Sequence, residues 1–166
     1  MTGANGHSIL FPVALEAGLA MLGGGDVITA FRGGDLRGHF WPAAPRVANE
    51  VAILCPGFTE FCEKHGATCR ALHERGYDVL VIDWPGQGRS GHFGRDPLAV
   101  HVDDFSDYLA AMDAVLAAAG LDQRDCLLMG HSMGGHLALR LAEHYAGGVK
   151  AVILSAPMIL PPVTPA

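Results

Sequence analysis

The chain has 166 residues, of which 50% are hydrophobic and only 17% charged, a composition that excludes an intrinsically disordered protein and suffices for one domain with a substantial core. Its formal net charge of -6, without any cluster of lysine or arginine, excludes a nucleic-acid partner, because a phosphate backbone is bound by concentrated positive charge. None of the four cysteines forms a C-x-x-C pair. We therefore expect no metal, no organic cofactor and a reducing compartment.

The first 25 residues are rich in glycine, so we predict an N-terminal arm over residues 1–25 and a folded domain over residues 26–166. The apolar stretch Ile9–Leu22 lacks a basic flank and is interrupted by Pro12 and Glu16, which argues against a signal peptide. No stretch reaches the length of a transmembrane segment. These features favour a cytoplasmic protein.

Two short β-prone runs, Asp26–Arg32 and Leu36–Trp41, are separated by Gly33, Gly34 and Asp35. Glycine and aspartate are typical of the turns that join neighbouring antiparallel strands. The spacing predicts an antiparallel hairpin at the edge of a sheet.

Four apolar runs then follow that are typical of strands buried on both faces of a parallel sheet: Val51–Cys55, Tyr77–Ile82, Cys126–Met129 and Val149–Ser155. Segments with helical spacing separate them, which indicates successive β-α-β units with right-handed crossovers. The fold class we expect is therefore α/β, with functional residues at the carboxyl ends of the parallel strands.

The ends of two of the intervening helices are marked by typical capping residues. Thr59 is the expected N-cap of the helix that follows the first buried strand, and Gly76 is its expected C-terminal stop. Apolar residues from Val102 to Leu116 repeat at steps of three and four, and Gly120 closes this second helix.

Two polar stretches invite a functional interpretation. Asp103, Asp104 and Asp107 form an acidic cluster, but carboxylates at the start of a helix stabilise its positive end, and this explanation is simpler than a catalytic one. Residues 83–91 form a glycine-rich loop that lacks the spacing of a phosphate-binding P-loop. Neither stretch predicts a catalytic or nucleotide-binding site.

The most informative motif is Gly130, His131, Ser132, Met133 and Gly134, which lies between an apolar strand-like run and a helical segment. A serine placed between a strand and a helix on a sharp turn needs glycines on both sides, because the turn leaves no room for side chains there. The pattern predicts a nucleophile elbow with Ser132 as the nucleophile. The alternative is that Ser132 only caps the helix.

Three blocks of the sequence, residues 54–64, 83–90 and 130–136, together resemble the α/β-hydrolase superfamily and, within it, bacterial lysophospholipases and the related monoacylglycerol lipases. The resemblance implies a mostly parallel, doubly wound sheet with an N-terminal antiparallel hairpin. It also implies that this chain is an N-terminal portion whose fold continues in a C-terminal part.

The same resemblance implies a serine hydrolase that cleaves carboxylic esters of acylglycerols or lysophospholipids through an acyl-enzyme. Ser132 would be the nucleophile, and the backbone N–H groups of Phe58 and Met133 would form the oxyanion hole. The partner is then a small lipid or acyl ester substrate.

Relatives carry the triad Asp and His after further strands and a cap, so we expect these residues beyond residue 166 and a nearly inactive 166-residue chain. The residue before the nucleophile points away from it, which makes His131 a poor candidate for the base. Two alternatives remain open: a non-catalytic binding domain, or a peptidase or amidase on the same fold. The final strand, Lys150–Ser155, would be an unpaired edge that invites association.

Overall fold

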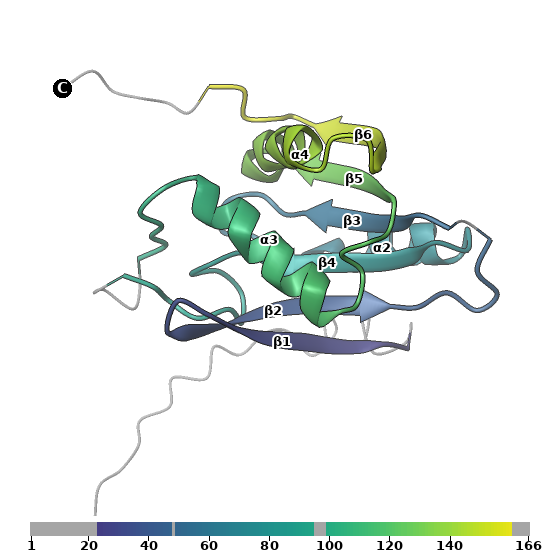
Figure 1. The fold of residues 1–166 in the computed structure, drawn as a ribbon, viewed down its shortest axis with the longest axis horizontal. Coiled ribbons are helices and arrows are strands. Elements are labelled where there is room, and N and C mark those ends of the chain that lie inside the picture. Colours follow the sequence, from purple (N-terminus) through teal and green to yellow (C-terminus); the bar gives the residue numbers. More distant parts are fainter. Residues whose placement is uncertain (1–22, 48, 95–98, 161–166) are drawn as a thin grey trace, which may run out of the picture.

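The computed structural model describes residues 23–47, 49–94 and 99–160. The described part of the chain forms one six-stranded sheet with helices on both faces (Figure 1). Most of the predicted N-terminal arm, residues 1–22, lies outside the described residues. No helix of the described segments is long and apolar enough to cross a membrane.

The strands are β1 (Gly25–Phe31), β2 (Gly34–Trp41), β3 (Val51–Cys55), β4 (Asp78–Asp83), β5 (Cys126–His131) and β6 (Val149–Ser155). The helices are the 3-10 helix η1 (Cys62–His65) and the α-helices α2 (Gly66–His73), α3 (Ser106–Ala118) and α4 (Met133–His144). The strand order is β1-β2-β4-β3-β5-β6. Strands β3 to β6 are parallel to one another, and β2 is antiparallel to both β1 and β4.

The predicted hairpin is confirmed, since β1 pairs with β2 and lies at one edge of the sheet. Its turn is shorter than predicted, because Gly34 and Asp35 belong to β2 and only Arg32 and Gly33 connect the strands. Both connecting residues have a positive φ, of 45° and 84°. That pair of angles is what a two-residue turn needs to match the right-handed twist of the strands.

Two apolar cores lie on opposite faces of the sheet, because successive residues of a strand point to opposite sides. Helices α3 and α4 cover one face, where Ile53, Leu80 and Leu128 are buried against them. Helix α2 covers the other face, against Leu54 and Val81 (Figure 1). The interior positions of β3 and β4 are therefore apolar on both faces, as predicted for a parallel sheet with both faces covered.

The predicted glycine stops are confirmed. Gly76 has a φ of +82°, its N–H donates to His73 O, and the next N–H donates to Leu72 O. Gly120 repeats this arrangement after α3 with a φ of +67°. Both are helix endings in which only glycine takes the left-handed conformation without strain.

Two predictions about helix starts are wrong. Thr59 does not cap a helix, because its backbone has a φ of +60° and the first helical turn begins three residues later, at Cys62. Helix α3 begins at Ser106, so Val102 precedes it. Before α3 the chain makes a turn in which the Asp104 carboxylate accepts a hydrogen bond from the Ser106 N–H at 2.7 Å, which supports a structural role for this carboxylate.

The structure contradicts the prediction that β6 is buried and confirms the expectation that it is an edge strand. Ile153 and Leu154 are 44% and 37% exposed. The reason is position: β6 pairs with β5 on one side and forms the second edge of the described sheet (Figure 1). Its apolar sequence is that of an interior strand, but among the described residues no strand lies beyond it.

The amino end of β4 is anchored by the buried carboxylate of Asp78. Its Oδ1 accepts a hydrogen bond from the Ala43 N–H at 2.7 Å, and its Oδ2 pairs with Arg46 at 2.6 Å and with Arg124. Burial would raise the pKa of Asp78, but these partners outweigh burial and hold the pKa below its ordinary value. The ionised form is thus favoured by the fold.

We predict that Asp78→Asn lowers the free energy of unfolding at neutral pH and flattens its dependence on acid. A carboxylate whose pKa is depressed in the folded state contributes stability above its unfolded pKa of about 4, and that contribution disappears as the pH falls through the folded value. Urea denaturation at a series of acidic pH values should show a steeper loss for the wild type than for the variant. Exposed Asp122 offers the control Asp122→Asn, and parallel curves for wild type and Asp78→Asn would contradict the prediction.

Candidate active site

Ser132 lies between the last residue of β5 and the first residue of α4, with φ 52° and ψ −120°. Residues with a Cβ rarely adopt this backbone conformation, and it persists only where the surrounding structure imposes it. The flanking glycines show what imposes it. A Cβ at Gly130 would lie 2.4 Å from Gly134 O, and a Cβ at Gly134 would lie 1.9 Å from Cys55 O. The turn therefore requires glycine at both positions, as the motif predicts.

Hydrogen bonds to β6 and to the segment that follows it hold the turn in place. The Ser132 N–H donates to Ser155 O at 3.0 Å, and the Met158 N–H donates to Ser132 O at 2.9 Å. The ring of His131 is also directed to β6, with Nδ1 3.1 Å from Ser155 O. The remaining histidine of the motif region, His136, packs edge-on against Phe105 at a centroid distance of 5.7 Å.

The loop after β3 passes directly beside the serine. A Cβ at Gly57 would lie 3.2 Å from Ser132 Cβ, so a side chain there would force the loop or the serine to shift. The Gly57 N–H donates to Glu60 Oε2 at 2.7 Å, and the Thr59 N–H donates to Gln87 Oε1. Between them, the Phe58 N–H binds no acceptor among the described residues.

Met133 supplies a second amide with no acceptor in the described part of the chain. It is the first residue of α4, and the first N–H groups of a helix have no partner within the helix. They also lie at the positive end of the helix dipole. The structure thus places Ser132 between two segments, each of which carries an amide without an acceptor among the described residues.

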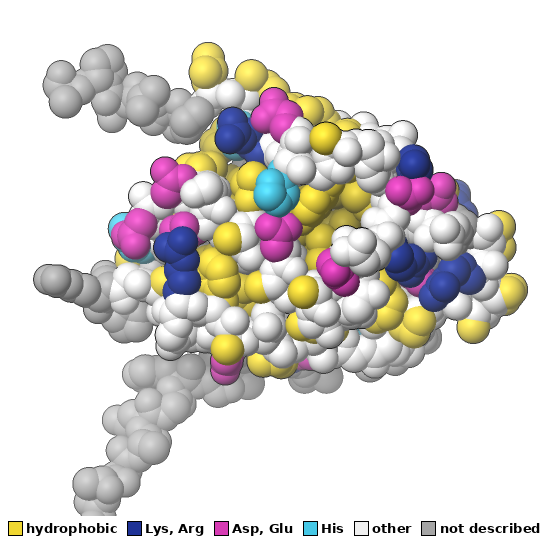
Figure 2. All heavy atoms as spheres, viewed as in Figure 1, with side chains coloured by type: hydrophobic (Ala, Val, Ile, Leu, Met, Phe, Trp, Pro, Cys, Tyr) yellow, Lys and Arg dark blue, Asp and Glu magenta, His cyan; other side chains and the backbone are white. Residues whose placement is uncertain are grey.

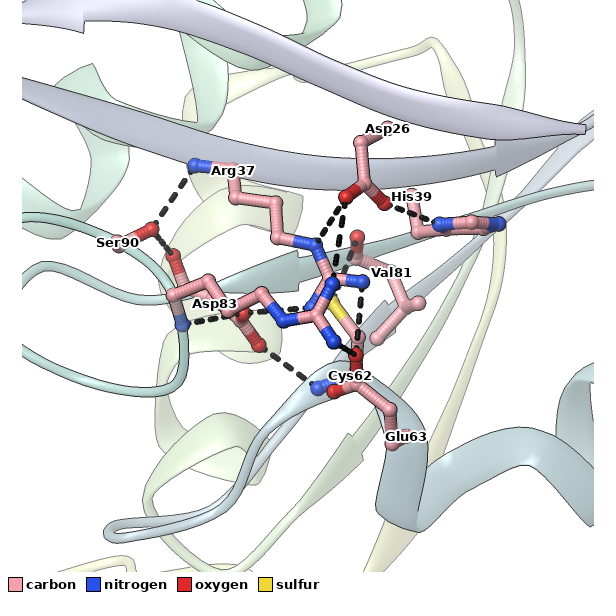
Figure 3. Close-up of polar contacts among 9 residues, drawn as sticks. Asp26, Arg37, His39, Cys62, Glu63, Val81, Asp83 and Ser90 are labelled. Carbon is pink, nitrogen blue, oxygen red and sulfur yellow. Dashed lines mark hydrogen bonds and ion pairs between the residues drawn. The ribbon is translucent and has the colours of Figure 1, made fainter. Parts of the chain in front are cut away.

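A buried charged cluster that no sequence motif indicates lies beneath the loops at the carboxyl end of β4 (Figure 3). Arg37 of β2 is 2% exposed and binds three carboxylates: Asp83 at 3.0 Å, Glu63 at 2.8 Å and Asp26 at 3.0 Å. Asp83 and Glu63 are themselves buried. Figure 3 shows their side chains converging on the guanidinium from β4 and η1.

Asp83 also connects the loops around the serine. Its Oδ1 accepts a hydrogen bond from the Cys62 N–H at 2.7 Å, and its Oδ2 accepts one from the Arg89 N–H at 2.8 Å. Ser90 extends the connection by donating to Asp83 O at 2.6 Å and accepting from the Arg37 N–H at 2.9 Å. The glycine-rich loop over residues 83–91, for which the sequence predicts no catalytic or nucleotide-binding role, thus supports the loops around the serine. No sequence signal pairs Arg37 with Asp83, because 46 residues separate them.

We predict that Ser132→Gly is more stable than Ser132→Ala by about 1 kcal/mol, because glycine relieves the positive-φ strain and alanine keeps it. Chemical denaturation of the two variants measures the difference. At Ser106, which begins α3, the order should be reversed, since glycine is the poorer helix former. Equal stabilities for the two Ser132 variants would show that the turn is unstrained.

We also predict that Gly134→Ala destabilises the fold by at least about 2 kcal/mol, because overpacking forces backbone to move. The clash is with the Cys55 carbonyl, which cannot rotate away. Gly25→Ala is the control, since nothing lies within 4 Å of a Cβ there. The measurement is thermal unfolding of both variants beside the wild type, and an unchanged midpoint for Gly134→Ala would refute the close contact.

Comparisons with known proteins identify relatives of this chain. Lysophospholipase L2 of Escherichia coli strain K12 is 37% identical over 113 residues, which are 66% of this chain and 33% of that protein. Monoacylglycerol lipase of Mycolicibacterium smegmatis is 28% identical over 111 residues, again 66% of this chain and 38% of that protein. The chain thus spans about a third of the length of the curated relatives it matches.

Among solved structures, a soluble variant of monoglyceride lipase from Saccharomyces cerevisiae is 22% identical, with a TM-score of 0.65 over 83% of this chain and 45% of that one. This likeness shows the fold and confirms the expected α/β-hydrolase architecture. The family profile described as serine aminopeptidase, S33, matches residues 47–166. Since that match covers most of the sequence, including both loops and the elbow, the chain belongs to the serine aminopeptidase S33 family of α/β-hydrolases.

Proposed function

We propose that this protein contributes the nucleophile of a serine hydrolase that cleaves carboxylic esters of acylglycerols or lysophospholipids. The observation that carries the proposal is the conformation of Ser132. It is a partly exposed serine at φ 52°, forced onto the tip of a central strand by the close packing of Gly130 and Gly134. A helix cap needs no such strain, whereas a nucleophile that must stand clear of its neighbours does.

The oxyanion hole that we propose consists of the N–H groups of Phe58 and Met133. Support comes from their position in two segments that flank Ser132 and from the absence of a competing acceptor among the described residues. Each amide would stabilise the negative charge that develops on the carbonyl oxygen in the transition state.

The reaction would proceed by two displacements. Ser132 Oγ forms a bond to the ester carbonyl carbon while its proton passes to a general base, and the carbonyl electrons move onto the oxygen. Collapse of this intermediate breaks the bond to the alcohol, which takes up the proton, and leaves an acyl-enzyme. Water then attacks the acyl carbon with help from the same base and releases the carboxylic acid.

We propose that the base and its acid partner come from the part of the domain that this chain does not span. The relatives above are about three times as long as the matched region, so they contain enough further sequence to carry these two residues. Without a base, a serine hydroxyl is a weak nucleophile at neutral pH, and losing a triad member lowers the rate by several powers of ten. Residues 1–166 alone should therefore hydrolyse esters very slowly.

An apolar surface near the elbow supports a substrate with an acyl chain. Phe58 is 54% exposed, and Ile159 and Leu160, which follow closely after the Met158–Ser132 hydrogen bond, are 59% and 83% exposed. Figure 2 shows hydrophobic side chains along the segment that leaves β6, at the upper left. Two of the relatives are named for lipid substrates, a lysophospholipid and a monoacylglycerol.

The family description gives a second candidate, hydrolysis of a peptide bond by the same serine. The chemistry differs only in the leaving group, which is an amine in place of an alcohol.

We further propose a cytoplasmic location, supported by four cysteines that are all free and buried. The exposed edge of β6 is the proposed site of association with further β structure.

We predict that Ser132→Ala, in the protein expressed to the natural stop of its reading frame, lowers p-nitrophenyl ester turnover by about 1,000-fold or more. The variant should also lose covalent labelling by a fluorophosphonate. Exposed Ser106 provides the matched control, and Ser106→Ala should turn over esters like the wild type. Equal turnover by wild type and Ser132→Ala would contradict the proposal. A preference for aminoacyl-p-nitroanilide substrates would favour the peptidase alternative.

A further inference from the structure

The loop beside Ser132 is closed by a reciprocal pair of hydrogen bonds. The Gly57 N–H donates to Glu60 Oε2 at 2.7 Å, and the Glu60 N–H donates to Gly57 O at 3.2 Å. The two residues thus bracket a four-residue turn with Phe58 and Thr59 in its centre. A Cβ on Gly57 would lie 3.1 Å from Glu60 Oε2 and 3.2 Å from Ser132 Cβ, so the carboxylate contacts the loop on the side close to the serine.

The centre of this turn is strained and externally supported. Thr59 is β-branched and has a φ of +60°, a conformation that such residues rarely adopt. Its N–H is held by Oε1 of Gln87, a side chain that is 4% exposed. The Gln87 N–H in turn donates to Trp84 O at 2.9 Å, and Trp84 Nε1 donates to Pro56 O at 2.9 Å. The turn is therefore fixed on both sides of Phe58.

We propose that Glu60 and Gln87 are positioning residues that hold the Phe58 amide toward Ser132 by binding the N–H groups on either side of it. This inference rests on the proposed function. Neither side chain needs to touch a substrate to act in this way. Their contribution is preorganisation, since an amide already aimed at the developing oxyanion costs no reorganisation during the reaction.

The surroundings of Glu60 keep its carboxylate in the required place and charge state. Oε1 pairs with Lys64 at 3.1 Å, and Oε2 lies 3.2 Å from His65 Nε2. Burial would raise the pKa of Glu60, but the Gly57 N–H and Lys64 outweigh it and hold the pKa below its ordinary value. The carboxylate is therefore ionised at neutral pH, and its bond to the amide is charge-assisted and strong.

The test compares Glu60→Ala, Glu60→Gln and Gln87→Met in the protein expressed to its natural stop. Removing a whole oxyanion donor costs about 100- to 1,000-fold in kcat, so loosening one should lower kcat by about 10- to 100-fold with KM within about twofold of the wild type. Glu60→Gln retains an acceptor oxygen and should recover most of the loss. The matched controls Glu143→Ala and Gln123→Met change exposed residues and should leave both constants unchanged.

A second measurement does not depend on turnover. The NMR order parameter of the Phe58 N–H should fall from about 0.85 in the wild type to below about 0.6 in Glu60→Ala and Gln87→Met, while the controls keep the rigid value. A circular dichroism spectrum like that of the wild type would show that the variants fold.

The possible results separate the two proposals. If Ser132→Ala abolishes turnover but Glu60→Ala and Gln87→Met retain the wild-type kcat, the positioning role is wrong and the proposed function stands. If Ser132→Ala remains active, the proposed function fails, and the order parameter of Phe58 decides whether these side chains fix the loop. A rise in KM at constant kcat, or an unchanged order parameter in both variants, would overturn the inference.

Discussion

The backbone of α4 lies so close to the end of β3 that one methyl group at Gly134 would come within 1.9 Å of the Cys55 carbonyl oxygen. This contact fixes the distance between two neighbouring strands at the point where both end. Because β3 and β5 are parallel and adjacent, their following loops must then meet above the same edge of the sheet. The approach of Gly57 to Ser132 is the direct consequence, and the position of the Phe58 loop beside the serine depends on it.

A second constraint fixes the loops from below. The Arg37 guanidinium and the carboxylate of Asp83 join β2, η1 and the loop after β4 in one buried cluster. Burying such charges costs desolvation energy, so a paired cluster adds little net stability, yet removing one partner would leave an uncompensated buried charge. The cluster therefore acts mainly on geometry: the loop that carries Phe58 and the loop that carries Gln87 cannot move apart without breaking it.

The sequence predicted the elements whose cause is local. Mainly apolar runs identified β3, β4 and β5, and the glycines at 76 and 120 marked helix ends, because both signals act within a few residues. The apolar pattern of β6 wrongly predicted a buried strand, since its apolar residues look the same at an edge as in the interior. Its place at an edge was expected only from the resemblance to a longer fold. The Thr59 conformation and the Arg37 cluster were missed for a related reason: each depends on a partner dozens of residues away, Gln87 in one case and Asp83 in the other.

Residues with strained backbone conformations gather around Ser132. Four non-glycine residues of the described segments have a positive φ: Arg32, Thr59, Ser132 and Ala156. Arg32 belongs to the hairpin turn, which requires such angles. The other three surround one point, because Gly57 of the Thr59 turn contacts Ser132, and Ala156 follows the residue whose carbonyl binds the Ser132 N–H. Strained conformations of this kind cost about 1–3 kcal/mol each and persist where the surrounding structure over-determines them. Three such residues, the partly exposed Ser132 among them, lie together at the site. Their concentration there indicates that the fold tolerates a loss of stability in order to hold the Ser132 hydroxyl in its position.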